Sequence, residues 1–220
     1  MTATDGAEGT ELRIPPASDA AETAVAAARR LIAALLYAEQ VPAGEMGAMA
    51  AELTGLADRL ESRVPPVTGA VPGGERTWKT RSREDAALRN PGNGRQNVIA
   101  PPLSMRGRPD GSVSGEVTLG LLYEGPPGCV HGGILALLVD HVFGVANFWA
   151  GAVGPTAELI MRYKRPSPLF MPLTVTAKQE GIDGRKIRTT GTISANGRTC
   201  VEAEGLFIVT LDFGVRREPA

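Results

Sequence analysis

Residues 131–149 read HGGILALLVDHVFGVANFW, and this stretch decides the fold. Its apolar side chains surround the whole circumference of a predicted helix, without the polar stripe that a surface helix turns toward water. A helix that is apolar on every face has to be covered on every face. We therefore expect the rest of the domain to wrap around it.

Short segments with strand character lie on both sides of this helix. The turn Pro109-Asp110-Gly111 separates two of them before the helix, and Asn196-Gly197, a strong hairpin signal, separates the last two. The predicted strands span about residues 103–106, 113–122, 156–164, 172–182, 186–195 and 199–211. One long buried helix among five or six antiparallel strands predicts an α+β fold in which a sheet curls around the helix.

The chain ahead of this domain has a different character. Two apolar patterns with helical spacing flank the helix breakers Pro42 and Gly44, which predicts a helical hairpin. Its second helix carries a stripe that should pack on another surface, formed by Met46, Met49, Leu53, Leu56 and Leu60. The chain then divides into a disordered tail (1–18), the hairpin (19–63), a linker and irregular segment (64–97), the main domain (98–213) and a C-terminal tail (214–220).

Composition narrows the classes of function. The 220 residues carry a net charge of −1, which argues against a protein that binds nucleic acid. Residues 160–200 nevertheless hold eight cationic and two anionic side chains, a local basic character that suits a small polyanion. The sequence has two cysteines, no secretory leader and no apolar run near the roughly 20 residues of a membrane span, so we expect a cytoplasmic protein.

Two features of the central helix point to chemistry. Asp140 is an acidic residue in an apolar helix, where an isolated carboxylate is costly unless it has a partner or a function. The helical pattern alone leaves open whether it is a satisfied buried acid or a catalytic group. At the helix start, His131-Gly132-Gly133 offers backbone N–H groups without helical acceptors at the positive end of the helix dipole. Such groups form a candidate oxyanion site.

The spacing of these two features has a structural consequence. Gly132 and Asp140 are eight residues apart, which is about 12 Å along a helix. One scissile carbonyl cannot lie within about 3 Å of both groups on one helix. If both groups act on the same bond, they come from two chains related by a two-fold axis, which predicts a homodimer with two composite sites.

This part of the chain resembles a known family. Residues 124–133, EGPPGCVHGG, with an aspartate nine residues after the histidine, are similar to the phenylacetic-acid-degradation-type (PaaI-like) acyl-CoA thioesterases of the hotdog superfamily. The runs TAEL at 156–159 and YKRP at 163–166 resemble the branch that includes the human mitochondrial acyl-CoA thioesterases. The resemblance covers about residues 97–211 and implies a hotdog fold.

The resemblance also implies roles for individual residues. Asp140 would act as general base or nucleophile on an acyl-CoA thioester, and Thr156 would orient the water or the carboxylate. The amide of Gly132 or Gly133 would polarise the carbonyl, with His131 shaping the turn. The phosphates of coenzyme A would be held by Arg162, Lys164, Arg185 and Lys186. No metal or other cofactor is implied, and the assembly would be a homodimer or a tetramer built from two of them.

Two other functions stay open at this point. A hotdog domain could bind acyl-CoA without turnover, although the intact set of Asp140, His131-Gly132-Gly133 and Thr156 argues against it. A hydratase or dehydratase would need an acid–base pair that usually involves a histidine. His141 neighbours Asp140 but points about 100° away around the helix, which disfavours that chemistry.

Overall fold

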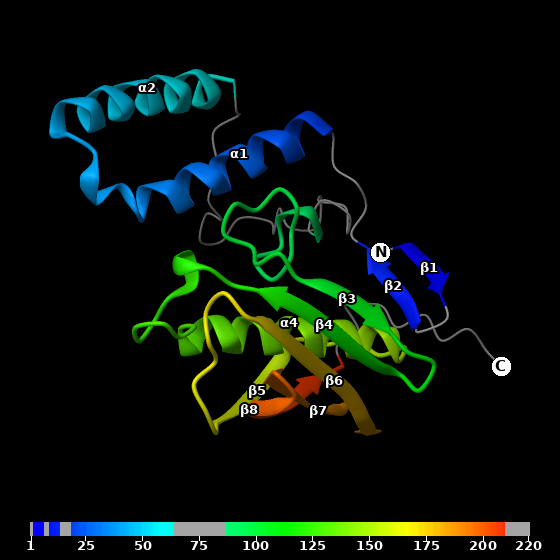
Figure 1. The fold of residues 1–220 in the computed structure, drawn as a ribbon. Coiled ribbons are helices and arrows are strands. Elements are labelled where there is room, and N and C mark those ends of the chain that lie inside the picture. Colours follow the sequence, from blue (N-terminus) through cyan, green and yellow to red (C-terminus); the bar gives the residue numbers. More distant parts are fainter. Residues whose placement is uncertain (1, 7–8, 14–18, 64–86, 210–220) are drawn as a thin grey trace.

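Helix α4 (Gly132–Trp149) runs through the middle of the main domain, and an antiparallel sheet curls around it (Figure 1). This computed structural model describes residues 2–6, 9–13, 19–63 and 87–209. The central helix that the sequence predicts is confirmed, and so is the α+β arrangement of a sheet around it. The helix is not covered on every face, because Phe148 is 51% exposed and Asp140 and Gly144 are only partly buried.

The sheet has eight strands in the order β1-β2-β3-β4-β6-β7-β8-β5, and all neighbouring strands are antiparallel. The sequence predicts five or six strands; β3 to β8 supply six, and two further strands extend the sheet. The strands are Thr2–Gly6 (β1), Gly9–Arg13 (β2), Ser104–Gly107 (β3), Ser112–Thr118 (β4), Thr156–Tyr163 (β5), Pro172–Asp183 (β6), Lys186–Ala195 (β7) and Arg198–Ile208 (β8). Among the described strands, β5 forms one edge and pairs only with β8.

The N-terminal segment corrects one expectation. The sequence predicts a disordered tail over residues 1–18, but β1 and β2 lie within it and pair with each other. β2 continues the sheet by pairing with β3 through Thr10 and Glu11, and Leu12 is buried in the core. Backbone pairing to an existing strand explains how such short, polar segments become strands without a clear apolar alternation.

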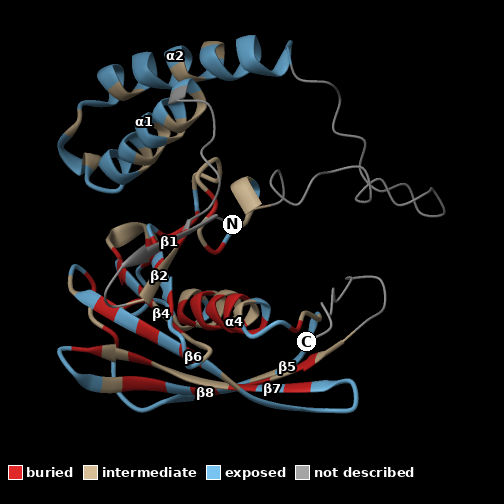
Figure 2. Ribbon diagram, turned by 90° about the vertical axis from the view of Figure 1, so that its right-hand side faces the viewer, coloured by how far each residue is buried: buried red, intermediate tan, exposed pale blue. Residues whose placement is uncertain are grey.

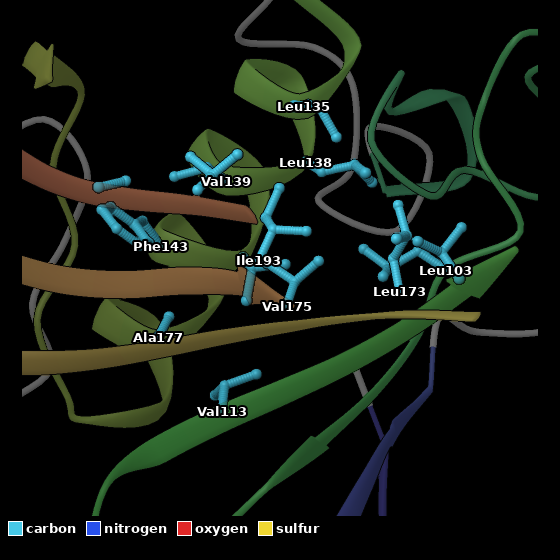
Figure 3. Close-up of a cluster of buried hydrophobic side chains, with 14 of the residues drawn as sticks. Leu103, Val113, Leu135, Leu138, Val139, Phe143, Leu173, Val175, Ala177 and Ile193 are labelled. Carbon is cyan, nitrogen blue, oxygen red and sulfur yellow. The ribbon is translucent and has the colours of Figure 1, made fainter. Parts of the chain in front are cut away.

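Phe143 packs α4 closely against the sheet. Its ring lies over Gly191 of β7 and Gly205 of β8, where an added Cβ would come within 2.6 and 2.7 Å of the ring. Val175 and Ile193 of the sheet belong to the same core (Figure 3). By length and composition alone α4 could cross a membrane, but here its apolar side chains pack against the sheet.

Two predicted turns are confirmed by the backbone geometry. Asn196 and Gly197, between β7 and β8, both have positive φ, 48° and 70°, as a two-residue type I′ hairpin turn requires. Gly111, with φ of 79°, closes the turn between β3 and β4. Asp110 stabilises that turn by accepting from the backbone N–H and the hydroxyl of Ser112, at 3.1 and 2.6 Å.

Two helices precede the main domain and lie to one side of the sheet (Figure 2). These are α1 (Asp19–Leu35) and α2 (Ala43–Glu61), joined by the short helix η1 (Ala38–Gln40). Their positions match the predicted helical hairpin. Arg29 of α1 donates hydrogen bonds to backbone carbonyls in the loop 94–98, so α1 is attached directly to the main domain.

The apolar stripe of α2 does not pack as the sequence predicts. None of the residues of α2 is buried, and Leu56 and Leu60 are 55% and 67% exposed. The segment predicted as a linker is described only from residue 87 on, so residues 64–86 lie outside the described residues, as does the predicted tail 214–220.

Candidate active site

Asp140 lies on a partly exposed face of α4, beside the edge strand β5. The carboxylate is half-buried, and the hydroxyl of Thr156, the first residue of β5, donates to its Oδ1 at 2.7 Å. One turn further along, a Cβ added at Gly144 would meet no atom of the described residues within 4 Å, so among these residues the surface beside the carboxylate is open. The fold therefore joins Asp140 to Thr156 and leaves room for a ligand next to them.

The N-terminal turn of α4 presents one unused backbone donor. His131 is the N-cap, and its Nδ1 accepts from the N–H of Gly133 at 3.0 Å. The carbonyl of Gly132, which belongs to the same peptide unit as the Gly133 N–H, accepts from the hydroxyl of Tyr163 at 3.0 Å. Within the described part of the chain the N–H of Gly132 has no acceptor. Gly132 is thus the candidate oxyanion donor, whereas the N–H of Gly133 is already occupied.

The two halves of the candidate site are tied to opposite ends of β5. The first residue, Thr156, contacts Asp140, and the last residue, Tyr163, contacts Gly132. Gly132 and Asp140 are eight residues apart on one helix, which separates them by about 12 Å. A single chain therefore holds an acid and an oxyanion donor that cannot reach the same carbonyl.

The four predicted phosphate ligands do not form one patch on a single chain. Arg162 of β5 forms an ion pair with Glu204, and Lys164, the residue that follows β5, forms one with Glu202 at 3.0 Å between Nζ and Oε2. The other two, Arg185 and Lys186, lie at the hairpin between β6 and β7, where Arg185 Nε donates to the carbonyl of Val209. Glu202 and Ile208, the residues of β8 beside the two groups, are six residues or about 20 Å apart along the strand.

His141 is packed away from the open face of α4. A Cβ at Gly92 would come within 2.3 Å of its ring, so the loop that contains Gly92 lies directly on the imidazole. Its Nε2 is buried and has no hydrogen-bond partner among the described residues. Burial lowers the pKa of His141 from 6.5 to about 4, although the neighbouring Asp140 carboxylate acts in the opposite direction. A neutral, enclosed imidazole of this kind is part of the packing of α4.

Tyr163 is the site residue whose role the sequence does not indicate. Its hydroxyl fixes the carbonyl of Gly132, and its ring atoms would lie 3.5 Å from a Cβ at that glycine. In the sequence Tyr163 is only the first residue of the YKRP run, 31 positions after Gly132. No local spacing signals the contact, because it depends on β5 returning along the full length of α4.

A central helix wrapped by an antiparallel sheet defines the class of hotdog-fold proteins. The chain is similar over 93% of its length to the crystal structure of protein RHA08564, a thioesterase superfamily protein, with 45% identity, a TM-score of 0.78 and 98% of that chain covered. The chain belongs to the thioesterase superfamily. A family model described as "Hypothetical protein RHA1_ro05818, N-terminal helical domain" matches residues 12–69, which include α1 and α2.

Curated relatives match a shorter part of the chain. Acyl-coenzyme A thioesterase THEM4 of Xenopus laevis is 37% identical over 87 residues, 39% of this chain and 39% of the relative. The Mus musculus protein of the same name is 40% identical over 91 residues, 40% of this chain and 39% of the relative. The matched region thus spans about two fifths of the length of these relatives.

Proposed function

We propose that this chain is an acyl-CoA thioesterase that hydrolyses an acyl-CoA thioester to a carboxylic acid and free coenzyme A. One observation carries the proposal. The acid, Asp140, is hydrogen-bonded to the first residue of β5, and the oxyanion donor, Gly132, is hydrogen-bonded through its carbonyl to the last residue of β5. The thioesterase superfamily membership and the names of the curated relatives support the choice of reaction.

The site is completed by a second copy of the chain. Among the strands that the structure describes, β5 lies at the edge and has one unpaired backbone side, and its side chains Ile160 and Tyr163 are 37% and 53% exposed. Unpaired strand edges readily pair with another chain. Antiparallel pairing of β5 with β5 of a second copy places the Thr156 end of one strand beside the Tyr163 end of the other. Asp140 then faces Gly132 of the second copy, and the same two-fold axis builds a second, identical site.

The chemistry follows from these groups. The N–H of Gly132 donates to the thioester carbonyl and stabilises the negative charge that develops on its oxygen. Asp140 either accepts a proton from water as the water attacks the carbonyl carbon, or attacks that carbon itself to form an anhydride that water then opens. In both routes the carbon–sulfur bond breaks and the sulfur takes up a proton. The hydroxyl of Thr156 fixes the orientation of the carboxylate.

The same two-fold pairing gathers the cationic side chains. Arg162 and Lys164 lie toward the Tyr163 end of β5, and the hairpin with Arg185 and Lys186 lies toward the Thr156 end. Antiparallel pairing brings Arg162 and Lys164 of one copy toward the hairpin of the other copy that carries Arg185 and Lys186. We propose that this combined surface binds the phosphates of coenzyme A. On binding, Arg162 and Lys164 would exchange their ion pairs with Glu204 and Glu202 for contacts with phosphate.

A thiol-release assay over acyl-CoAs of graded length tests the proposal. We expect turnover by the intact protein and a loss of several orders of magnitude in Asp140→Asn, with unchanged thermal unfolding. Asp58→Asn, on exposed α2, is the matched control and should keep full activity. Full activity in Asp140→Asn would refute the role of Asp140, and tight binding of acyl-CoA without thiol release would identify a binding protein instead.

The choice between base and nucleophile needs a separate measurement. Single-turnover hydrolysis in ¹⁸O-labelled water places label in the enzyme only if Asp140 attacks the carbonyl. If Asp140 acts as a base, all of the label appears in the carboxylic acid product.

A further inference from the structure

A pocket of about 320 Å³ lies between α1 and the main domain. One wall is formed by Ala33 of α1 and by Leu36 and Tyr37, the two residues that follow α1. The opposite wall is formed by the short helix η3 (Leu121–Tyr123) together with Phe170. Pockets of this size that are lined mainly by apolar side chains and a few polar groups are typical of small-molecule binding sites.

The wall formed by α1 is fixed in place. The guanidinium of Arg29 donates to the carbonyls of Asn97, Gly94 and Val98 at 2.6, 3.2 and 3.3 Å. An ion pair between Arg95 and Glu22, at 3.2 Å, adds a second attachment near the start of α1. Because both attachments join α1 to the same loop, the pocket is present before any ligand arrives.

Phe170 is an unusual residue at the rim of this pocket. Its φ is 60°, in the left-handed region that bulky side chains rarely adopt, and its side chain is 60% exposed. A backbone hydrogen bond to the carbonyl of Leu119, at 2.8 Å, holds it there, and the ring lies near Gly120. Strained backbone that persists in a folded protein concentrates at functional sites. An exposed aromatic ring held in this way favours a ligand with an apolar surface.

The wall of the pocket is hydrogen-bonded to the residue that begins α4, beside the candidate active site. The carbonyl of Tyr123, in η3, accepts from the N–H of His131 at 2.9 Å, and Glu124 forms a β-bridge with Val130. The wall of the pocket is therefore bonded to the N-cap of the helix whose next residue, Gly132, is the oxyanion donor. An acyl tail that runs from a carbonyl at Gly132 to this pocket would pass His131 and η3.

We propose that this pocket binds the distal part of a straight alkyl acyl chain, so that α1 determines the chain length the enzyme accepts. The inference rests on the proposed thioesterase function, since it places the tail of the same substrate. It assigns a role to the N-terminal helices that the hotdog domain alone does not require.

The test compares two non-hydrolysable thioethers, S-decyl-CoA and S-ethyl-CoA, by calorimetry with the full chain. Each methylene that leaves water for an apolar pocket tightens binding about fourfold. If three of the eight additional methylenes of the decyl chain enter the pocket, S-decyl-CoA should bind roughly fifty-fold tighter than S-ethyl-CoA. Ala33→Trp fills the pocket and should reduce this ratio by about tenfold or more.

The control is the neighbouring alanine on the same helix. Ala34 is also exposed but does not line the pocket, so Ala34→Trp should keep the wild-type ratio. Leu36→Gln, a milder change on the pocket wall, should lower the ratio in the same direction as Ala33→Trp. Binding of S-ethyl-CoA should be equal in all variants, which shows that the coenzyme A site is intact.

The outcomes separate the two proposals. Equal binding of both thioethers to the wild type, or equal ratios in Ala33→Trp and Ala34→Trp, would overturn the assignment of the pocket. If the chain-length ratio behaves as expected but no acyl-CoA is hydrolysed, the pocket assignment stands and the proposed enzymatic function fails.

Discussion

Replacing Thr156 by valine tests whether the hydroxyl–carboxylate bond in the candidate site contributes to turnover. Valine keeps the branched shape of threonine but cannot donate the 2.7 Å hydrogen bond to Asp140. A hydrogen bond to a charged group contributes about 1.5–3 kcal/mol. Because about 1.4 kcal/mol corresponds to a tenfold change in rate, we expect kcat to fall between about tenfold and a hundredfold. The assay is thiol release from the best acyl-CoA substrate under saturating conditions.

A matched control for this variant lies on the outer face of the sheet. The hydroxyl of Thr190 also donates to a carboxylate, that of Glu180, so Thr190→Val removes the same chemistry at a different place. We expect Thr190→Val to keep the wild-type kcat and Thr156→Ser to restore most of it, since serine retains the hydroxyl. Wild-type turnover in Thr156→Val, or an equal loss in Thr190→Val, would refute the reasoning.

Three further predictions concern the surroundings of the site. His141 has a pKa of about 4 in the folded chain and 6.5 when free, so below pH 6.5 the unfolded chain binds the proton more readily. The free energy of unfolding should decrease by roughly 3 kcal/mol as the pH falls from 6.5 to 4, and urea unfolding of His141→Gln should lack this component. Gly92→Ala should lower the thermal unfolding temperature, because its Cβ collides with the His141 ring; an unchanged temperature would contradict that packing. Tyr163→Phe frees the carbonyl of Gly132 and should lower kcat by about tenfold with little change in KM, whereas a change in KM alone would point to a binding role.

The central helix and most of the sheet can be predicted from the sequence because their signals are local. Residues 131–149 are apolar on every face, and the Asn196-Gly197 turn specifies a hairpin by its conformational preferences alone. β1 and β2 carry no comparable pattern, since β2 becomes a strand by pairing with the backbone of β3 and β1 by pairing with that of β2. The exposed stripe of α2 shows the converse case, in which an apolar period predicts a helix correctly but does not identify its partner.

The residue types of the candidate site were predictable, and the family resemblance implied the contact of Thr156 with Asp140, but the other contacts were not predictable. Asp140 stands out because an isolated acid is unusual in an apolar helix. The glycines at the helix start stand out because they leave the unpaired N–H groups of the first turn open to a ligand. Which amide remains available depends on the His131 side chain, which occupies Gly133 and leaves Gly132 free. That selection and the contact of Tyr163 with Gly132 depend on tertiary geometry, which the spacing of residues does not encode.

The central claim, a site composed of Asp140 from one chain and Gly132 from another, is tested most directly by mixing two inactive variants. Asp140→Asn removes the acid, and Gly132→Pro removes the N–H at the first helical position, where proline is well tolerated after an extended residue such as His131. Random reassembly of equal amounts gives half heterodimers, each with one intact site of two, so about a quarter of the wild-type activity should return. No recovery in a mixture shown to contain heterodimers would mean that the acid and the oxyanion donor act from the same chain, which would contradict the composite site.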